Sequence, residues 1–172
     1  DVLLAPLYDV RQITDTRLPA PVGTTVQNQF TMFCIVNTDR DYGNIVRIRF
    51  KEWKRSRECL DIDIPLTTND VWCGEVSRKS GGGGTLNTPV NGGERWVDLD
   101  RISVAATVGG ISYPNGYFSG ALFPTAGIDF QTYDIEADET NKPARCEMGY
   151  IEFIGEERVN APTTTSEPWR FP

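Results

Sequence analysis

Histidine is absent from this chain of 172 residues, so the side chain most often used as a general base is missing. The usual serine and cysteine triads and most zinc sites also depend on histidine. Four cysteines are present, at positions 34, 59, 73 and 146, but their spacing is not that of a zinc ribbon. The residue types therefore predict neither an activated nucleophile nor a zinc centre.

Carboxylates are the remaining catalytic option, because paired Asp and Glu side chains carry out glycoside hydrolysis. The acidic residues on expected strands are Glu52, Glu58, Asp61, Asp63, Glu75, Glu147 and Glu152. Acids that alternate with apolar residues are typical of the solvent-facing side of a sheet. Calcium binding by residues 129–139, or by Asp39 and Asp41, is an alternative, although neither run has EF-hand spacing. We predict no enzyme activity, no metal and no cofactor.

Aromatic residues are stronger candidates for a binding site. Residues 109–127 combine aromatic side chains with several glycines and prolines, which predicts a long exposed loop. A loop this apolar needs a partner to cover it. Tyr113, Tyr117 and Phe118 are the candidate ligand-binding residues, for carbohydrate or for another surface protein.

The even number of cysteines, with no CxxC motif, predicts two disulfides and an oxidising compartment. Four cysteines allow three pairings. A hairpin centred on Leu66 would place Cys59 directly opposite Cys73, at the separation that a disulfide needs. This geometry predicts Cys59–Cys73 and leaves Cys34 to pair with Cys146.

The strands that carry these residues show as alternating apolar and polar side chains. Residues 45–51 alternate apolar with basic residues, and residues 60–64 alternate apolar residues with aspartates. Similar patterns predict strands over residues 25–36, 71–76 and 146–154, and no helix longer than two turns. We predict an all-β fold, a single antiparallel β-sandwich of immunoglobulin-like or jelly-roll type, with long loops and two disulfides.

Both ends of the chain are candidates for contacts between subunits. Residues 1–157 are expected to form the sandwich, residues 1–13 an edge strand open to exchange, and residues 158–172 a Thr/Pro-rich tail typical of a linker or a glycosylated stalk. An apolar strand can add to a neighbour's sheet. The predicted subunit-interface residues are Leu3, Leu4, Leu7, Val10, Trp169 and Phe171. The alternative is that the first ten residues are simply the domain's own first strand.

Charge and hydropathy argue against two kinds of partner, nucleic acid and the membrane interior. The 17 basic and 24 acidic residues give a net charge of −7, which argues against a nucleic-acid partner. No apolar run approaches the roughly 20 residues of a membrane span. The chain does not begin with a charged, apolar leader, so for an exported protein the signal is expected to have been removed already.

The three strands predicted over residues 44–76 carry a recognisable motif. With the preceding VNT and the later GYIE, the chain resembles a group of secreted bacterial proteins that share VRF.E...SRE.LD..I.LS..DVW and a late EGYIE.IE strand. The matching segments are residues 36–38, 46–52, 56–61, 70–72 and 149–152. The chain departs from the pattern at Cys59 and Cys73 and over residues 81–127. The resemblance implies export and an all-β domain, and it carries no catalytic residue.

Two functions remain as hypotheses. The first is an extracellular structural subunit that assembles with itself into a surface filament or fibre by strand or tail exchange. The second is a secreted adhesin module that binds carbohydrate or protein through residues 109–127.

Overall fold

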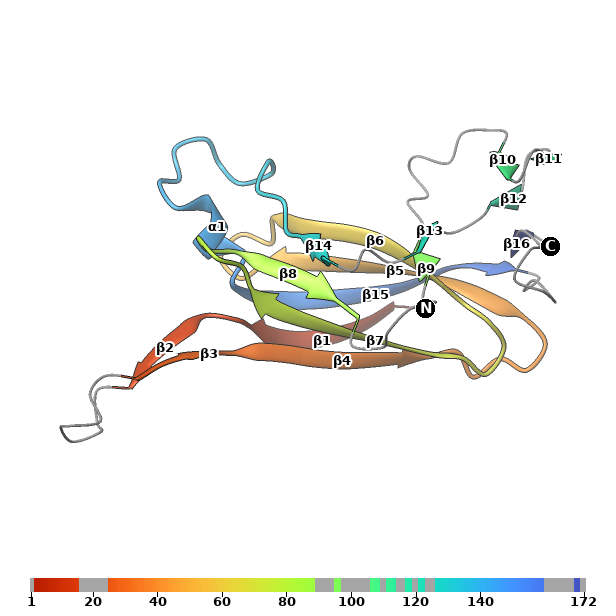
Figure 1. Cartoon of the computed structure of the whole chain (residues 1–172), viewed down its shortest axis with the longest axis horizontal. Helices are drawn as coiled ribbons and strands as arrows, with labels where there is room; N and C mark the ends of the chain where they lie inside the picture. Colours follow the sequence, from red (N-terminus) through yellow and green to blue (C-terminus); the bar gives the residue numbers. More distant parts are fainter. Residues whose placement is uncertain are drawn as a thin grey trace.

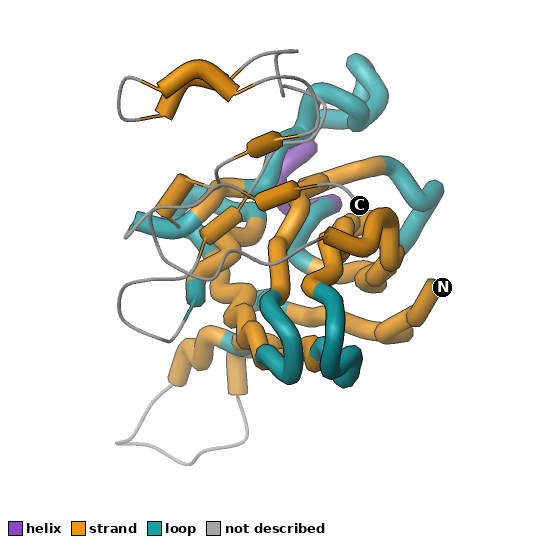
Figure 2. The backbone as a smooth tube through the Cα atoms, turned by 90° about the vertical axis from the view of Figure 1, so that its right-hand side faces the viewer, coloured by secondary structure: helices purple, strands orange, loops and turns teal. Residues whose placement is uncertain are grey.

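The computed structural model describes residues 2–15, 25–88 and 126–159 together with six short strands. Two antiparallel four-stranded sheets pack against each other, which confirms the predicted β-sandwich with two disulfides (Figure 1). The short strands are β9 (Arg95–Trp96), β10 (Ala106–Val108), β11 (Ile111–Tyr113), β12 (Tyr117–Phe118), β13 (Ala121–Leu122) and β16 (Trp169–Arg170). Figure 2 looks along the long axis, with the strands running toward the viewer.

The first sheet has the strand order β1–β15–β5–β6. Its strands are β1 (Val2–Asp9), β15 (Met148–Val159), β5 (Gly43–Glu52) and β6 (Glu58–Leu66). β5 and β6 form a hairpin, in which Ile48 lies opposite Ile62 and Arg47 opposite Asp63. Because side chains alternate along a strand, the isoleucines face the second sheet and the charged pair faces outward.

The second sheet has the strand order β14–β8–β7–β4. Its strands are β14 (Ile128–Asp129), β8 (Gly84–Asn87), β7 (Val71–Arg78) and β4 (Phe30–Val36). The expected hairpin between β6 and β7 is absent, because the chain crosses between the sheets there. Asp70 stabilises the crossing by accepting hydrogen bonds from the Thr67 amide at 3.0 Å and the Thr67 hydroxyl at 2.9 Å.

The predicted disulfide pairing is wrong for this reason. Cys59 lies in the first sheet and Cys73 in the second, so they are not cross-strand neighbours. Cys73 lies directly opposite Cys34 on the adjacent strand β4 and is bonded to it. The second disulfide joins Cys59 to Cys146, which lies in the turn between α1 and β15.

Aromatic rings fill the space between the sheets. Tyr8 packs edge-on against Phe50 and Phe130, with ring centroids 5.6 and 5.7 Å apart. Gly149 makes room for this cluster, because a Cβ there would lie 1.8 Å from the carbonyl oxygen of Lys51 and 2.9 Å from the Tyr8 ring. Close approach of β15 to β5 therefore requires glycine at this position.

The edges of the two sheets come together where β1 and β4 begin a ribbon. β2 (Gln12–Asp15) continues from β1 and pairs with β3 (Thr25–Asn28), which leads into β4 (Figure 1). The Asp9 amide donates to the Thr31 hydroxyl at 3.1 Å, and this hydroxyl lies 3.3 Å from the Asp9 carbonyl oxygen. β1 and β4 are thus neighbouring edge strands on one side of the sandwich.

The short helix α1 (Lys142–Arg145) leads into β15 at the end of the sandwich where the β5–β6 turn lies (Figure 1). Asn141 caps the helix by accepting from the Ala144 amide, and Pro143 lies in its first turn. In the part of the chain that the structure describes, no helix has the length and apolar character needed to cross a membrane.

The two disulfides differ in exposure, which predicts an order of reduction. Cys34 is exposed on edge strand β4, whereas Cys59 and Cys146 are 1% and 0% exposed. Because thiol–disulfide exchange needs access to a sulfur atom, brief treatment with a small thiol should reduce Cys34–Cys73 well before Cys59–Cys146. Alkylation followed by peptide mass spectrometry measures this. Equal labelling of all four cysteines, or a linked Cys59–Cys73 peptide before reduction, would contradict the structure.

Candidate interaction surface

The amino-terminal half of β1 is apolar and exposed. Val2, Leu3, Leu4 and Leu7 are 68%, 66%, 57% and 59% exposed. β1 is the edge strand of the first sheet: it is hydrogen-bonded to β15 on one side, and no strand among the described residues pairs with it on the other. An open edge with apolar side chains is a template for another strand.

The carboxyl-terminal half of β1 is fixed in the core instead. Tyr8 and Val10 are 0% exposed. The Val10 amide donates to the Glu147 carbonyl at 2.8 Å, and burial, with Glu52 nearby, raises the pKa of the Tyr8 phenol. Val10 therefore belongs to the core of its own domain, and the expectation that it contacts a second subunit is corrected here.

β1 is also interrupted. Pro6 lacks an amide proton, and the pairing with β15 shifts register between Ala5 and Tyr8. A strand added to the open edge of β1 would find regular pairing only along Val2–Ala5. The apolar end of β1 is thus available to a partner, but over a short length.

The neighbouring edge strand β4 presents a second apolar row. Phe33 and Ile35 point inward, so Phe30, Met32 and Val36 point outward, at 61%, 55% and 56% exposed. We call the exposed apolar residues of these two strands the apolar edge: Val2, Leu3, Leu4 and Leu7 of β1, and Phe30, Met32 and Val36 of β4. Of these residues, Leu3, Leu4 and Leu7 were predicted from the sequence, whereas Val2 and the β4 residues were not, although the alternation in FTMFCIV carries the signal.

The outer face of the first sheet has the opposite character. Arg47 of β5 lies 3.0 Å from Asp63 and 3.4 Å from Asp61 on β6, and 2.9 Å from Glu156 on β15. Burial, the largest cause, raises the pKa of Asp61 to about 6, although Arg47 opposes it. Arg47 therefore joins carboxylates of two neighbouring strands in a network of ion pairs on the outer face.

The ion-pair network on the outer face continues toward the β5–β6 turn. Glu58 accepts from Arg49 at 2.8 Å and from Lys51 at 3.0 Å. Burial alone would raise the pKa of Glu58, but these two cations outweigh it and lower the pKa. The basic residues of β5 are therefore bound to acids of β6, as opposed cross-strand charges are expected to be.

The sequence predicts that the acids on the strands face solvent, but three of them are buried. Glu52, Asp63 and Glu147 are only 0%, 2% and 7% exposed. Each is paired with an arginine, because a buried carboxylate without a partner is strongly destabilising. Glu147, for example, accepts from Arg78 at 3.1 Å.

Glu52 ends β5, is fully buried and is the centre of a polar network. Arg145 of α1 holds both of its carboxylate oxygens, with Nε 3.0 Å from Oε2 and a second nitrogen 2.7 Å from Oε1. The amides of Lys54, Arg55 and Arg57 also donate to it, at 2.7, 2.6 and 3.2 Å. Burial alone would raise the pKa of Glu52, but these hydrogen bonds outweigh it and lower the pKa.

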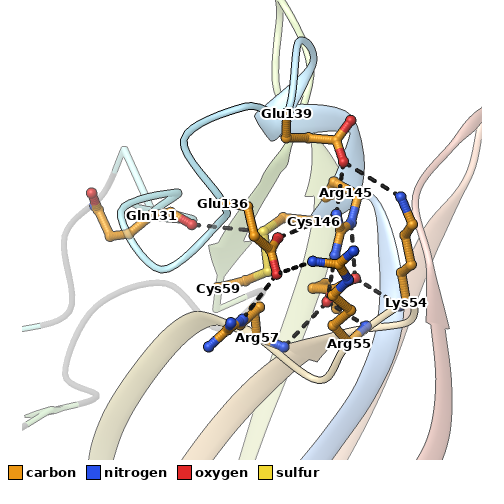
Figure 3. A network of polar contacts seen from close by, with 10 residues as sticks. Lys54, Arg55, Arg57, Cys59, Gln131, Glu136, Glu139, Arg145 and Cys146 are labelled. Atoms are coloured by element: carbon orange, nitrogen blue, oxygen red, sulfur yellow. Dashed lines mark hydrogen bonds and ion pairs between the residues drawn. A yellow bond between two sulfur atoms is a disulfide. The ribbon is translucent and has the colours of Figure 1, made fainter.

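Two further acids close the network from the segment before α1. Glu139 lies 2.8 Å from Arg145, and Glu136 accepts from Arg55 at 2.9 Å and from Arg57 at 3.2 Å (Figure 3). Every one of these acids has a basic partner on another segment. The network therefore binds the β5–β6 turn to α1, beside the Cys59–Cys146 disulfide.

The remaining predicted binding residues fall largely outside the described part. The backbones of Tyr113 and of Tyr117–Phe118 lie in β11 and β12, and their side chains are not described. β12 pairs with β16, so the backbone of Trp169 lies opposite Phe118. Phe171 lies outside the described residues.

No group of three or more His, Cys, Asp or Glu residues that could hold a metal ion occurs among the described residues. Comparison of the chain with models of protein families, with curated proteins and with solved structures gives no match. The resemblance to secreted bacterial proteins stays a prediction. The apolar edge is accordingly the candidate site that the described structure offers.

The Glu52–Arg145 pair yields a stability prediction. Arg145→Met keeps much of the side-chain volume but leaves Glu52 buried without its cation, so the free energy of unfolding should fall by about 3–5 kcal/mol. Arg55→Met is the control: Arg55 is paired with Glu136 but 58% exposed, and its loss should cost less than about 1 kcal/mol. Urea denaturation measures both. An equal fall in the free energy of unfolding for both variants would show that the buried Glu52–Arg145 pair contributes no more to stability than an exposed pair.

Asp61 yields a pH prediction. Its pKa of about 6 in the folded protein lies above the value of about 3.9 in an unfolded chain, so the folded state binds the extra proton between these values. The contribution of Asp61 to stability therefore falls as pH rises from 4 to 6. Asp61→Asn should stabilise the protein at pH 7 by about 1–2 kcal/mol and leave it unchanged at pH 4. A gain of equal size at both pH values in thermal unfolding would refute this assignment.

Proposed function

We propose that this protein is an extracellular structural subunit that assembles with copies of itself into a surface filament or fibre. The observation that carries the proposal is the exposed apolar half of β1 at the open edge of the first sheet. Two disulfides support an oxidising compartment outside the cytoplasm. Four of the candidate carboxylates, Glu52, Glu58, Asp63 and Glu147, are instead bound by arginines or lysines, which favours a structural role.

The contact we propose is addition of a strand to the open edge, the β-augmentation mode. Exchange of the whole first strand is disfavoured, because it would withdraw Tyr8 from its contacts with Phe50 and Phe130 and Val10 from the core. Strand addition leaves these residues in place. It also covers apolar side chains that a single copy exposes to water, with a gain of about 25 cal/mol per Å² of apolar surface.

The adhesin alternative rests on Tyr113, Tyr117 and Phe118, whose side chains are not described. It stays a prediction. Loss of glycan binding in Tyr117→Ala or Phe118→Ala would support it.

Self-assembly is tested by charging the apolar edge. Leu3→Lys combined with Leu4→Lys should still fold, since both side chains are more than half exposed, and should weaken self-association at least about tenfold, the equivalent of 1.4 kcal/mol. Trp53→Lys with Tyr133→Lys adds the same charge at aromatic residues that are 56% and 74% exposed outside β1 and β4. Sedimentation over a range of concentrations, with negative-stain electron microscopy of the unreduced protein, measures assembly.

Circular dichroism melts check that all variants are folded. Wild-type protein that sediments as a monomer at every concentration would refute self-assembly. Equal assembly of the edge variant and the control would show that β1 is not the contact.

A further inference from the structure

β4 lacks the features that protect exposed sheet edges. Natural edge strands carry charges, prolines or bulges that prevent pairing with another chain. The seven residues of β4, FTMFCIV, include no charge and no proline, and their register with β7 is unbroken from Phe30 to Val36. Among the described residues no strand pairs with β4 on the side away from β7, so this edge presents a row of unpaired backbone hydrogen-bonding groups.

The other edge strands of the two sheets are interrupted or carry charge. β1 contains Pro6 and a register shift, β6 carries Glu58, Asp61 and Asp63, and β14 ends in Asp129. Among these four edges, only β4 is free of both charge and proline. Two copies of a chain with a net charge of −7 repel each other, so an uncharged edge is where they can approach most closely.

The outward row of β4 is complementary to itself. Phe30, Met32, Cys34 and Val36 point to the same face, and Cys34 is held in its disulfide with Cys73. If two β4 strands run antiparallel with Phe33 opposite Phe33, Phe30 lies opposite Val36 and Met32 opposite Cys34. This register pairs all seven residues, over roughly 24 Å at about 3.4 Å per residue, and every outward pair is apolar.

We propose that a second copy of this chain docks on β4 through its own β4, antiparallel and about a two-fold axis at Phe33. The two second sheets then form one continuous eight-stranded sheet. The contact is isologous, because the same strand serves both copies. This inference rests on the proposed self-assembly and adds a contact at β4 to the one proposed at β1. A fibre needs a further contact, for which the exposed half of β1 is available.

The arrangement also accounts for the position of β1. β1 and β4 are neighbouring edges, tied where Asp9 meets Thr31. A copy docked on β4 brings its own β1 to the same side of the assembly.

Complementary charges test the register. Phe30→Lys alone places a lysine opposite the partner's Val36 at both ends of the pair, and Val36→Glu alone places a glutamate opposite the partner's Phe30. Each variant should dimerise at least about tenfold more weakly than wild type. In a mixture of the two variants, the introduced lysine of one copy lies opposite the introduced glutamate of the other, and the original Phe30–Val36 pair remains at the opposite end. The mixture should therefore regain most of the affinity as heterodimers.

Sedimentation of each variant and of the equimolar mixture, with one variant carrying a fluorescent label, measures this, and circular dichroism confirms folding. Two weakened variants whose mixture forms no heterodimer would refute the pairing centred on Phe33. If both variants dimerise like wild type while Leu3→Lys/Leu4→Lys does not, the β4 contact is wrong and the proposed function stands. A wild-type protein that is monomeric throughout refutes both.

Discussion

The buried ion pair between Glu52 and Arg145 is the interaction on which the rest of this structure depends. Glu52 ends β5, and Arg145 immediately precedes the half-cystine that leads into β15, the strand paired with both β5 and β1. A carboxylate with no exposed surface is tolerated because Arg145 and three backbone amides satisfy it. The pair thus fixes where β15 enters the first sheet, and with it the place of the edge strand β1.

The β-sandwich has sheet edges that differ in the side chains they present. The acids of β6 are matched to the bases of β5, which covers one side of the first sheet with paired charge. On the opposite side, β1 and β4 present apolar side chains to water. The sandwich therefore has one side covered by paired charges and one side with exposed apolar residues at its sheet edges.

Alternation along single strands could be predicted from the order of residues alone. Ile48, Phe50, Leu60 and Ile62 are buried as the period of two requires, because neighbouring side chains on a strand must point to opposite faces. The class of fold and the presence of two disulfides followed from the same kind of evidence.

Pairing between strands was decided only by the tertiary structure. Cys59 and Cys73 lie 14 positions apart and fit a hairpin, yet the chain crosses to the other sheet between them, and each bonds to a distant cysteine. Val10 is as apolar as Leu7 but is buried, because β1 enters the core at Tyr8. Glu52 alternates like a surface acid, and only Arg145, 93 residues away, makes its burial stable. Local periodicity fixes which way a side chain points, whereas contacts across the chain fix what it meets.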